Sequence, residues 1–504
     1  MRGSFFGLNI ATRGLFTSQR ALDITNHNIN NVNTPGYSRQ VAEQRAAKPI
    51  GLFDGTGMIG NGSEVIGVSR IRDEFLDFKY WSENVSYGEW TTKRTALEEL
   101  ESIFAETQES GTSKILNEFF GSMQELAKNP GSSQTREVVK STGEALAKHL
   151  NSIDAQLQKA RDDNNHIFKI KVDEINSYAK QIRDLNSQIH KSELDGSKAN
   201  DLRDRRAVLL DNLSKVVNIE VSEVIVGKLS NGKDNKQMQV SINGLFLVNH
   251  IHSHELECYE DEEDYNMYHV RWKQSENPME PRGGELKGYI DVRDGTGTSG
   301  EYKGVPYYMH KLDEFTRSFA KAFNEGIFRD DGKYYPGHAG GVGRDGSENI
   351  KFFSYDYNDS EALEDLDNYE NITAANITIS SDILHDINKI AAASVAGEFE
   401  NNDNILNLLE LRHDRRMFAE GAPEDFMRSL VANLGIDAQQ TVRMTENQNV
   451  IVEQIENRRL SVSGVSLDEE MANMVKYQHA YNAAAKMIAV INEIYDVTIN
   501  RMGV

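Results

Sequence analysis

The chain has 504 residues, of which 38% are hydrophobic, and a formal net charge of −23 at pH 7. This length is too great for one hydrophobic core and indicates about two to four domains. So strong a negative charge argues against binding to nucleic acid or to an anionic membrane surface, and it keeps copies of the chain apart unless apolar contacts overcome the repulsion. The single cysteine, Cys258, excludes an intrachain disulfide framework and a CxxC zinc site.

The first predicted element is a helix with one apolar stripe. Mainly apolar residues recur at alternating spacings of three and four, which places them on one side of a helix. This N-terminal seam contains Leu8, Ala11, Leu15, Leu22, Ile29 and Val32. Asn9 and Arg13 interrupt the apolar residues near the start, so we expect no cleavable secretory signal. No run in the chain approaches the ~18 apolar residues that a membrane helix needs.

This helix is predicted to end in a built-in turn. Five asparagines fall between residues 26 and 33, and their short amide side chains compete for backbone hydrogen bonds. Pro35 disfavours helical geometry at Thr34, and Gly36 permits a positive φ. The predicted turn contains Asn31, Asn33, Thr34, Pro35, Gly36 and Tyr37.

Residues 41–80 are glycine-rich and are predicted to form extended or hairpin structure. Residues 55–60 formally fit GxGxxG, the pattern of a dinucleotide site, which needs a strand before it and a helix that opens within it. More glycine and an alternating stretch follow here instead, so we expect no nucleotide site.

The longest helical pattern covers residues 82–215. Asn129-Pro130-Gly131 interrupts it, and Asp195-Gly196 ends its second part before a shorter helix. The apolar stripes along residues 85–190 are typical of helices that pack against each other in a core.

At Val216 the pattern changes from helical spacing to alternation. Apolar residues alternate before the turn Asn243-Gly244, so residues 216–285 are predicted to form a small β module. Residues 255–264 carry seven acids in ten, without the spacing and central glycine of a calcium loop, and are predicted to be a solvated loop.

Three histidines in this module form a candidate metal site. His250, His252 and His254 lie at spacing two and would share one face of a strand, where they could bind zinc or nickel. We favour an exposed strand end without a metal, because a metal would also need a fixed second shell. Residues 254–258 begin like the HExxH protease motif, but Cys258 stands in the last place and the surroundings are β-type.

After the module, residues 286–327 are predicted to be helical, residues 328–382 to return to the β module, and helices to resume at Ile383. Asp291, Arg293 and Asp294 could form an acid/base group, but their setting between a glycine-rich turn and a helix favours capping and salt bridges. The chain has neither GxSxG nor GxxxxGK, so we expect no catalytic residue, no metal and no cofactor.

The last 38 residues form a second striped helix. Its C-terminal seam contains Leu467, Met471, Met474, Tyr481, Ala485, Ile488, Tyr495 and Ile499, and it extends to Met502. A short helix with one apolar stripe is marginal alone in water. Each end is too small to bury both its own stripe and its partner's, so we expect the two ends to pair and also to contact neighbouring copies.

Both ends resemble signatures of the bacterial flagellar axial protein family, which comprises rod, hook and hook-associated proteins. The N-terminal resemblance rests on residues 26–40, Asn-His-Asn-Ile-Asn-Asn-Val-Asn-Thr-Pro-Gly-Tyr-Ser-Arg-Gln, and the C-terminal one on residues 463–486. Within this family, Tyr37-Ser38-Arg39-Gln40, the start of the tail at 463–467 and the long helical span favour a hook-associated protein of the hook–filament junction over a hook or distal rod protein.

The resemblance and the order of elements imply a mainly α fold with an inserted β module, in a nested multi-domain arrangement. The terminal helices would pair as a coiled coil, and a helical bundle would form the second layer. The expected domains are a terminal helical coiled-coil domain (1–40 with 464–504), a helical core domain (41–215 with 286–327 and 383–463) and a β-rich outer domain (216–285 with 328–382).

The resemblance also implies a structural role that is required for filament assembly, without catalysis. Implied partners are other copies of the chain, the hook protein, a second junction protein and a cytoplasmic export chaperone that holds the C-terminal helix, but neither nucleic acid nor a membrane. The implied location is the extracellular flagellum, reached by type III export without a cleaved signal. Two other classes stay open, an adhesin that binds through the β module and a metal enzyme.

Overall fold

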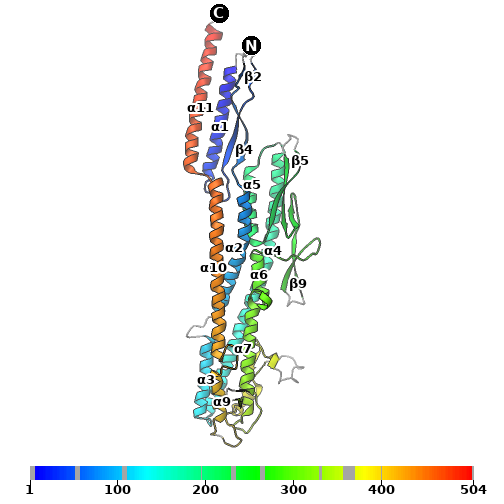
Figure 1. Cartoon of the computed structure of the whole chain (residues 1–504), viewed down its shortest axis with the longest axis vertical. Helices are drawn as coiled ribbons and strands as arrows, with labels where there is room; N and C mark the ends of the chain where they lie inside the picture. Colours follow the sequence, from blue (N-terminus) through cyan, green and yellow to red (C-terminus); the bar gives the residue numbers. More distant parts are fainter. Residues whose placement is uncertain are drawn as a thin grey trace. The chain divides into compact units, whose positions relative to one another are not determined.

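The computed structural model describes residues 6–51, 57–104, 111–194, 196–228, 234–261, 267–328, 332–355, 369–398 and 400–501. Helices dominate, and short strands lie beside them (Figure 1). This confirms the expected fold class of mainly α structure with inserted β structure.

The bounds of the regular elements are as follows. The helices are α1 (Phe6–Asn30), α2 (Glu74–Ile103), α3 (Thr112–Lys128), α4 (Ser133–Glu193), α5 (Asn200–Val216), α6 (Glu285–Asp294), α7 (Val305–Glu325), α8 (Ser381–His385), α9 (Asp403–Glu410), α10 (Pro423–Ser463) and α11 (Leu467–Asp496). The strands are β1 (Gln40–Ala46), β2 (Ile50–Gly51), β3 (Met58–Ile59), β4 (Ser63–Arg70), β5 (Glu220–Lys228), β6 (Asp234–Ile242), β7 (Leu245–Asn249), β8 (His252–Ser253), β9 (Leu256–Asp261), β10 (Met267–Trp272), β11 (Gly326–Phe328), β12 (Tyr334–Pro336), β13 (Phe353–Tyr355) and β14 (Ile377–Ile379).

The chain forms two compact units. Unit 1 is made from the segments 1–89, 170–286 and 446–504, and unit 2 from the segments 90–169 and 287–445. The residues of α2, α4 and α10 are divided between the two units.

In unit 1, the hairpin predicted within residues 41–80 is confirmed. β1 and β4 pair antiparallel from Gln40 opposite Arg70 to Ala46 opposite Ser63. The hairpin lies along α1, where the Thr17 hydroxyl donates a hydrogen bond to the Ser63 carbonyl at 3.1 Å. Part of the GxGxxG pattern lies outside the described residues, and its described part enters the short strand β3 rather than a helix, as expected.

Two further breaks predicted from sequence are also confirmed. α3 ends and α4 begins on either side of Asn129-Pro130-Gly131, and α4 ends just before the predicted stop at residues 195–196. Asn243 and Gly244 both adopt positive φ, 50° and 82°, as a two-residue turn between β6 and β7 requires.

The four-stranded antiparallel sheet has the order β5-β6-β7-β8, and β9 pairs with β10.

The core of unit 2 is an aromatic cluster on α7. Phe315, Phe319 and Phe323 recur along one face of this helix and are fully buried. The ring centroids of Phe319 and Phe353 lie 5.6 Å apart, and those of Phe323 and Phe352 lie 5.2 Å apart. Such ring pairs contribute beyond their buried area, so α7 organises this unit.

Strands β13 and β14 belong to this aromatic core, whereas residues 328–382 were expected to belong to the β module. The side chain of Asn324 on α7 accepts from the backbone N–H groups of Phe352 and Phe353 and donates to the Phe353 carbonyl. The glycine-, aspartate- and aromatic-rich composition of residues 328–382 predicts β structure here, but it carries no information about which helix the strands cover. Residues 356–368 lie outside the described part of the chain.

Candidate functional site

The two terminal helices run antiparallel, and α1 lies between α11 and the β1–β4 hairpin (Figure 1). At one end of the pair, Gly7 of α1 lies against the side chain of Ile491. At the other end, the Asn28 amide donates a hydrogen bond to the Glu470 carboxylate at 3.2 Å. The first and last helices of the chain are therefore direct neighbours along their length.

The predicted N-terminal seam lies in this covered region. Ala11 is buried, and the rest of the seam is half-buried: Leu8, Leu15, Leu22, Ile29 and Val32. The contact surface of α1 is thus largely satisfied by its own chain, and the role of the seam in contacts between subunits stays a prediction.

α11 has two apolar faces rather than one stripe. Residues of its predicted seam that share the side of Ile491 are half-buried: Met474, Tyr481, Ala485, Ile488 and Tyr495. Two others on α11 are exposed, Leu467 and Met471, and so is Ile499, which lies beyond α11 in the π-helical segment Val497–Arg501. A seam of period 3.5 drifts by ~20° per heptad around a straight helix of 3.6 residues per turn, so the predicted stripe starts on one side and continues on another. Met502 lies outside the described residues.

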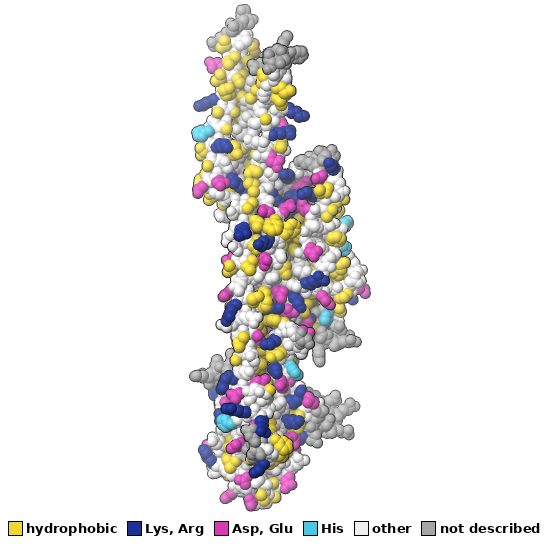
Figure 2. Space-filling model, in the orientation of Figure 1, with side chains coloured by type: hydrophobic (Ala, Val, Ile, Leu, Met, Phe, Trp, Pro, Cys, Tyr) yellow, Lys and Arg dark blue, Asp and Glu magenta, His cyan; other side chains and the backbone are white. Residues whose placement is uncertain are grey.

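We call the exposed side the outer face of α11. Its large side chains are about half exposed: Met471 (51%), Val475 (53%), Met487 (56%), Val490 (50%) and Ile494 (55%). Figure 2 shows hydrophobic side chains gathered on the surface of the terminal helices. Exposed apolar patches of this kind mark interaction sites.

The joint between the terminal helices and the rest of unit 1 centres on the buried amide of Asn28. Its Oδ1 accepts from the Tyr37 hydroxyl at 2.7 Å and from the Gln40 backbone N–H at 3.0 Å. Its Nδ2 donates to the Gln40 carbonyl at 2.9 Å and to Glu470. Burial and the nearby carboxylates of Asp201, Asp204 and Glu470 raise the pKa of Tyr37 above its usual value, which keeps the hydroxyl protonated as a donor.

Arg39 links this turn directly to the start of α11. Its backbone N–H donates to the Ser463 carbonyl at 2.8 Å. Its guanidinium forms ion pairs of 2.7 Å with Glu470, whose side chain is 3% exposed, and of 2.7 Å with Glu469, which is 62% exposed. The N-terminal and C-terminal signature segments therefore meet in space at one charged, hydrogen-bonded joint.

Ser38 and Gly36 fasten the same turn to α5. The backbone N–H and the hydroxyl of Ser38 both donate to the Asp204 carboxylate at 2.9 Å, and Arg70 forms an ion pair with it at 2.8 Å. Gly36 adopts φ +74°, and a Cβ at this position would lie 2.2 Å from a methyl group of Val208. Only glycine meets both requirements.

The remaining predicted turn residues are the exposed rim of this joint. Asn31 closes the end of α1 through its amide, which donates to the His27 carbonyl at 2.9 Å, and it accepts from the Thr34 hydroxyl at 3.1 Å. Asn33 and Pro35 are exposed. The rim borders a crevice of about 670 Å³ whose opposite wall is the end of α10 and its connection to α11, residues 460–466.

Four residues of the joint were not predicted as site residues: Asn28, Arg39, Asp204 and Glu470. The only sequence feature that could have indicated these residues is that polar or charged side chains stand next to an apolar stripe. A buried ion pair cannot be predicted from either residue alone, because the two partners are close only in the folded chain. Arg39 and Glu470 are more than 400 positions apart in the sequence.

In the joint, the ion pairs and hydrogen bonds are formed among the protein's own side chains, so the joint holds the terminal helices in place.

The candidate metal site is not formed. The histidines at 250, 252 and 254 do not converge: His250 occupies a turn with φ +55°, and Nδ1 of His254 pairs with the Phe246 carbonyl. The described residues contain no group of three or more side chains placed to hold a metal ion. The HExxH-like stretch leads into strand β9, as its β-type surroundings predicted.

The candidate acidic groups form salt bridges, as expected from their setting. Asp291 pairs with Lys93 and Lys287, and Asp294 pairs with the buried Arg293. In the acidic stretch, Glu255 pairs with Lys180 and Lys273, which lowers the pKa of Glu255 to about 2. Residues 256–261 of that stretch form strand β9 rather than the predicted loop, and residues 262–264 lie outside the described part of the chain. None of the described helices combines the length and apolarity needed to cross a membrane.

Three family models match the chain. Residues 97–341 match the helical domain of flagellar hook-associated protein FlgK, residues 456–502 match the flagellar basal body rod FlgEFG protein C-terminal family, and residues 8–37 match the flagella basal body rod protein family. The two rod-protein matches cover the segments that form α1 with its turn and α11.

Similar proteins extend over the whole chain. Flagellar hook-associated protein 1 of Bacillus subtilis is 31% identical over 100% of this chain and 99% of the relative. The proteins of the same name from Salmonella typhimurium and Escherichia coli are 26% and 25% identical over 98% of this chain and 99% of each relative. The structure of the flagellar hook junction protein FlgK from Burkholderia pseudomallei superposes with a TM-score of 0.60 and 14% identity, over 76% of this chain and 100% of that one.

Proposed function

Because this chain belongs to the flagellar hook-associated protein 1 family, we propose that its paired terminal helices form the surface through which copies assemble at the hook–filament junction. The chain is a structural component of the bacterial flagellum at that junction. The relationship covers the full length of the chain, including both ends.

The observation that carries the proposal is the outer face of α11. Burying a half-exposed Met, Val or Ile side chain stabilises a contact by roughly 1 kcal/mol, so its five residues offer roughly 5 kcal/mol to one neighbour. Association costs on the order of 4–15 kcal/mol in lost freedom of motion, and the net charge of −23 adds repulsion. One such contact is insufficient, so copies add to a layer in which each touches several neighbours, rather than form isolated dimers.

The joint at Asn28 and Arg39 gives this surface a defined position. α1 and α11 pair as an antiparallel coiled coil, and the ion pair between Arg39 and the buried Glu470 holds α11 at one axial register against α1. A stacked assembly needs such a register, because a slip of one helical turn would move the outer face by about 5.4 Å. In the layer, the terminal helices line the inner tube, with helical and β-rich domains outside them.

The partners follow from the same surface. Other copies of the chain, the hook protein below and a second junction protein above would cover the outer face in the assembled flagellum. Before export, a cytoplasmic chaperone would cover it on α11, because an exposed apolar face favours aggregation. The chain would act outside the cell, after passage through the flagellar type III export channel, and its role would be mechanical, without catalysis.

The test is deletion of the gene in its host, followed by complementation with variants. Deletion is expected to leave hooks without filaments and flagellin in the medium. The double variant Met487→Asp/Val490→Asp, which places charge on the outer face, should fail to restore filaments while the purified chain keeps its helical content. Gln454→Asp adds a charge at an exposed position of α10, away from the outer face of α11, and it should restore filaments. Normal filaments in the deletion strain would reject the junction role, and normal filaments with the double variant would reject this interface.

A further inference from the structure

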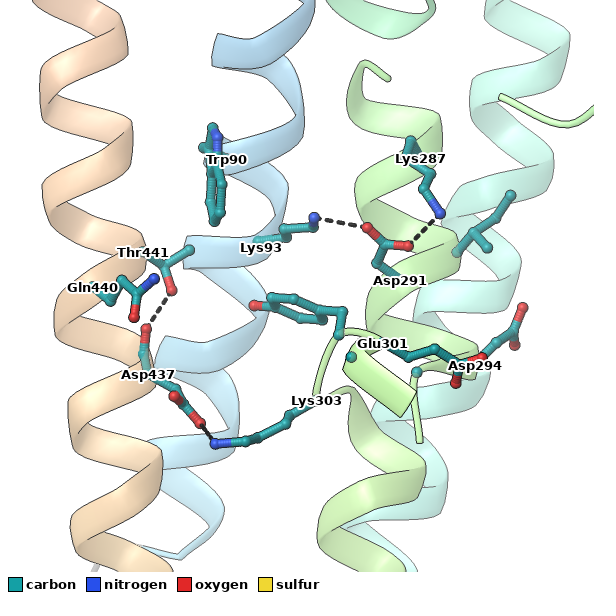
Figure 3. Close-up of a pocket in the computed structure, with 14 residues that line it drawn as sticks. Trp90, Lys93, Lys287, Asp291, Asp294, Glu301, Lys303, Asp437, Gln440 and Thr441 are labelled. Atoms are coloured by element: carbon teal, nitrogen blue, oxygen red, sulfur yellow. Dashed lines mark hydrogen bonds and ion pairs between the residues drawn. The ribbon is translucent and has the colours of Figure 1, made fainter. Parts of the chain in front are cut away.

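A cavity of about 670 Å³ lies entirely within unit 2 (Figure 3). Its walls come from α2, α6, the loop at residues 295–303 and α10, and side chains from all four converge on it. Pockets that bind small molecules have volumes of about 300–1,000 Å³. The cavity has the size of a ligand site and no part in the assembly surface proposed above.

One wall of the cavity is aromatic and is held in place. The Lys93 ammonium lies between two rings, 5.0 Å from the centroid of Trp90 and 4.6 Å from that of Tyr302. Lys93 is buried and is fixed by an ion pair of 2.7 Å with Asp291. The Thr445 hydroxyl donates to the Trp90 carbonyl at 3.0 Å. The Lys93 contact holds the indole ring and the Thr445 hydrogen bond holds its backbone, which lowers the entropic cost of stacking a ligand on the ring.

The charges around the cavity are already paired with one another. Asp291 lies between the ammonium groups of Lys93 and Lys287, at 2.7 and 2.5 Å, and Lys303 pairs with Asp437 at 2.8 Å (Figure 3). Such paired groups attract a net-charged ligand weakly, because the ligand would have to displace a partner that is already in place. They still offer lone pairs and N–H groups to a neutral polar ligand.

Two uncharged groups at the cavity are unused. The indole N–H of Trp90 and the amide of Gln440 have no hydrogen-bond partner among the residues that the structure describes. An indole offers a flat apolar face and one donor, and an amide offers two donors and an acceptor. A pyranose ring matches this set, because its axial C–H groups stack on an aromatic face while its hydroxyls both donate and accept.

We propose that this cavity is a saccharide-binding site, with Trp90 as the stacking platform and Gln440 and the paired carboxylates as hydroxyl partners. The ligand class is a neutral sugar, free or at the exposed end of a glycan. The alternative is that the ion pairs only hold the helices together. In that case the chain would bind no sugar. Replacement of Gln440, which is exposed and links no two helices, would then change neither binding nor stability.

The test is saturation-transfer NMR and titration calorimetry on the purified full chain. The probes are glucose, galactose, mannose and N-acetylglucosamine, and short linear oligomers of each. A single small sugar is expected to bind with a dissociation constant on the order of 1 mM. Tighter binding of an oligomer than of its monomer would identify a glycan end as the source, and equal binding would identify the free sugar.

Variants localise the binding. Gln440→Ala and Trp90→Phe each remove one hydrogen-bonding group and should weaken binding about fivefold, while Trp90→Ala should weaken it at least tenfold. Gln454→Ala, at another exposed position of α10, is the matched control and should leave binding unchanged. Trp90→Phe keeps the ring packing, so circular dichroism of this variant separates loss of binding from loss of folding. The proposal fails if no sugar binds, if Gln440→Ala and Trp90→Phe bind like the unaltered chain, or if citrate binds and the sugars do not.

Discussion

The ion pair between Arg39 and Glu470 should stabilise unit 1 far more than the neighbouring pair between Arg39 and Glu469. The two carboxylates lie at the same 2.7 Å from the guanidinium, but the Glu470 side chain is 3% exposed and that of Glu469 is 62% exposed. Removing one partner of a buried pair costs about 3–5 kcal/mol, and the partial exposure of Arg39, 19%, reduces this to about 2–3 kcal/mol for Glu470→Ala. Glu469→Ala should cost at most about 0.5 kcal/mol.

The assay is urea and thermal unfolding of the full chain, with limited proteolysis of the terminal helices as a local readout. At this size, 2–3 kcal/mol lowers the melting temperature by about 4–10 °C. A double-mutant cycle with Arg39→Ala should give a coupling energy above about 1.5 kcal/mol for Glu470 and below about 0.5 kcal/mol for Glu469. Equal losses for the two glutamates would refute the reasoning, because burial would then have no influence on the strength of the pair.

Two further predictions concern a buried histidine and a strained glycine. Burial lowers the pKa of His338 to about 4, below the ~6.5 of an unfolded chain, so the unfolded state takes up the proton first. The free energy of unfolding of unit 2 should therefore be constant above about pH 6.5 and fall by about 3 kcal/mol towards pH 4. Urea titrations at several pH values should show that His338→Gln removes this slope and that exposed His310→Gln keeps it. Gly36→Ala should lower the free energy of unfolding by about 1 kcal/mol for its positive φ and by about 1–3 kcal/mol more for the close contact of the new methyl group. Gly244→Ala, with φ +82° and open space around it, should show only the first loss. Equal losses of stability in the two variants would contradict the close contact at Gly36.

Much of the secondary structure follows from local chemistry. The asparagine-rich end of α1, the break around Pro130 and the turn at Asn243-Gly244 were all predictable, because each depends on the conformational preferences of a few adjacent residues. The family was predictable for a related reason, since its signature segments are continuous stretches at the two ends of the chain.

The tertiary placement of residues was less predictable. The composition of residues 328–382 predicts β structure but cannot show that the strands cover the aromatic face of α7. A heptad pattern predicts an apolar stripe on α11 but cannot separate the side against α1 from the outer face. The buried amide of Asn28 and its partner Glu470 are separated by 442 positions, and no local pattern marks them as a pair.

Because α1 lies between α11 and the β1–β4 hairpin, the two terminal helices should tolerate different substitutions. Substitutions on α1 must suit two surfaces of its own chain, so α1 and the hairpin should be exchanged between relatives only as one block. α11 contacts its own chain on one side, and its other side carries the proposed contacts with other molecules. On that proposal, compensatory change between interacting flagellar proteins should accumulate on Met471, Val475, Met487, Val490 and Ile494. A chimera that carries another species' α11 would be expected to incorporate into that species' flagellum more readily than one that carries its α1.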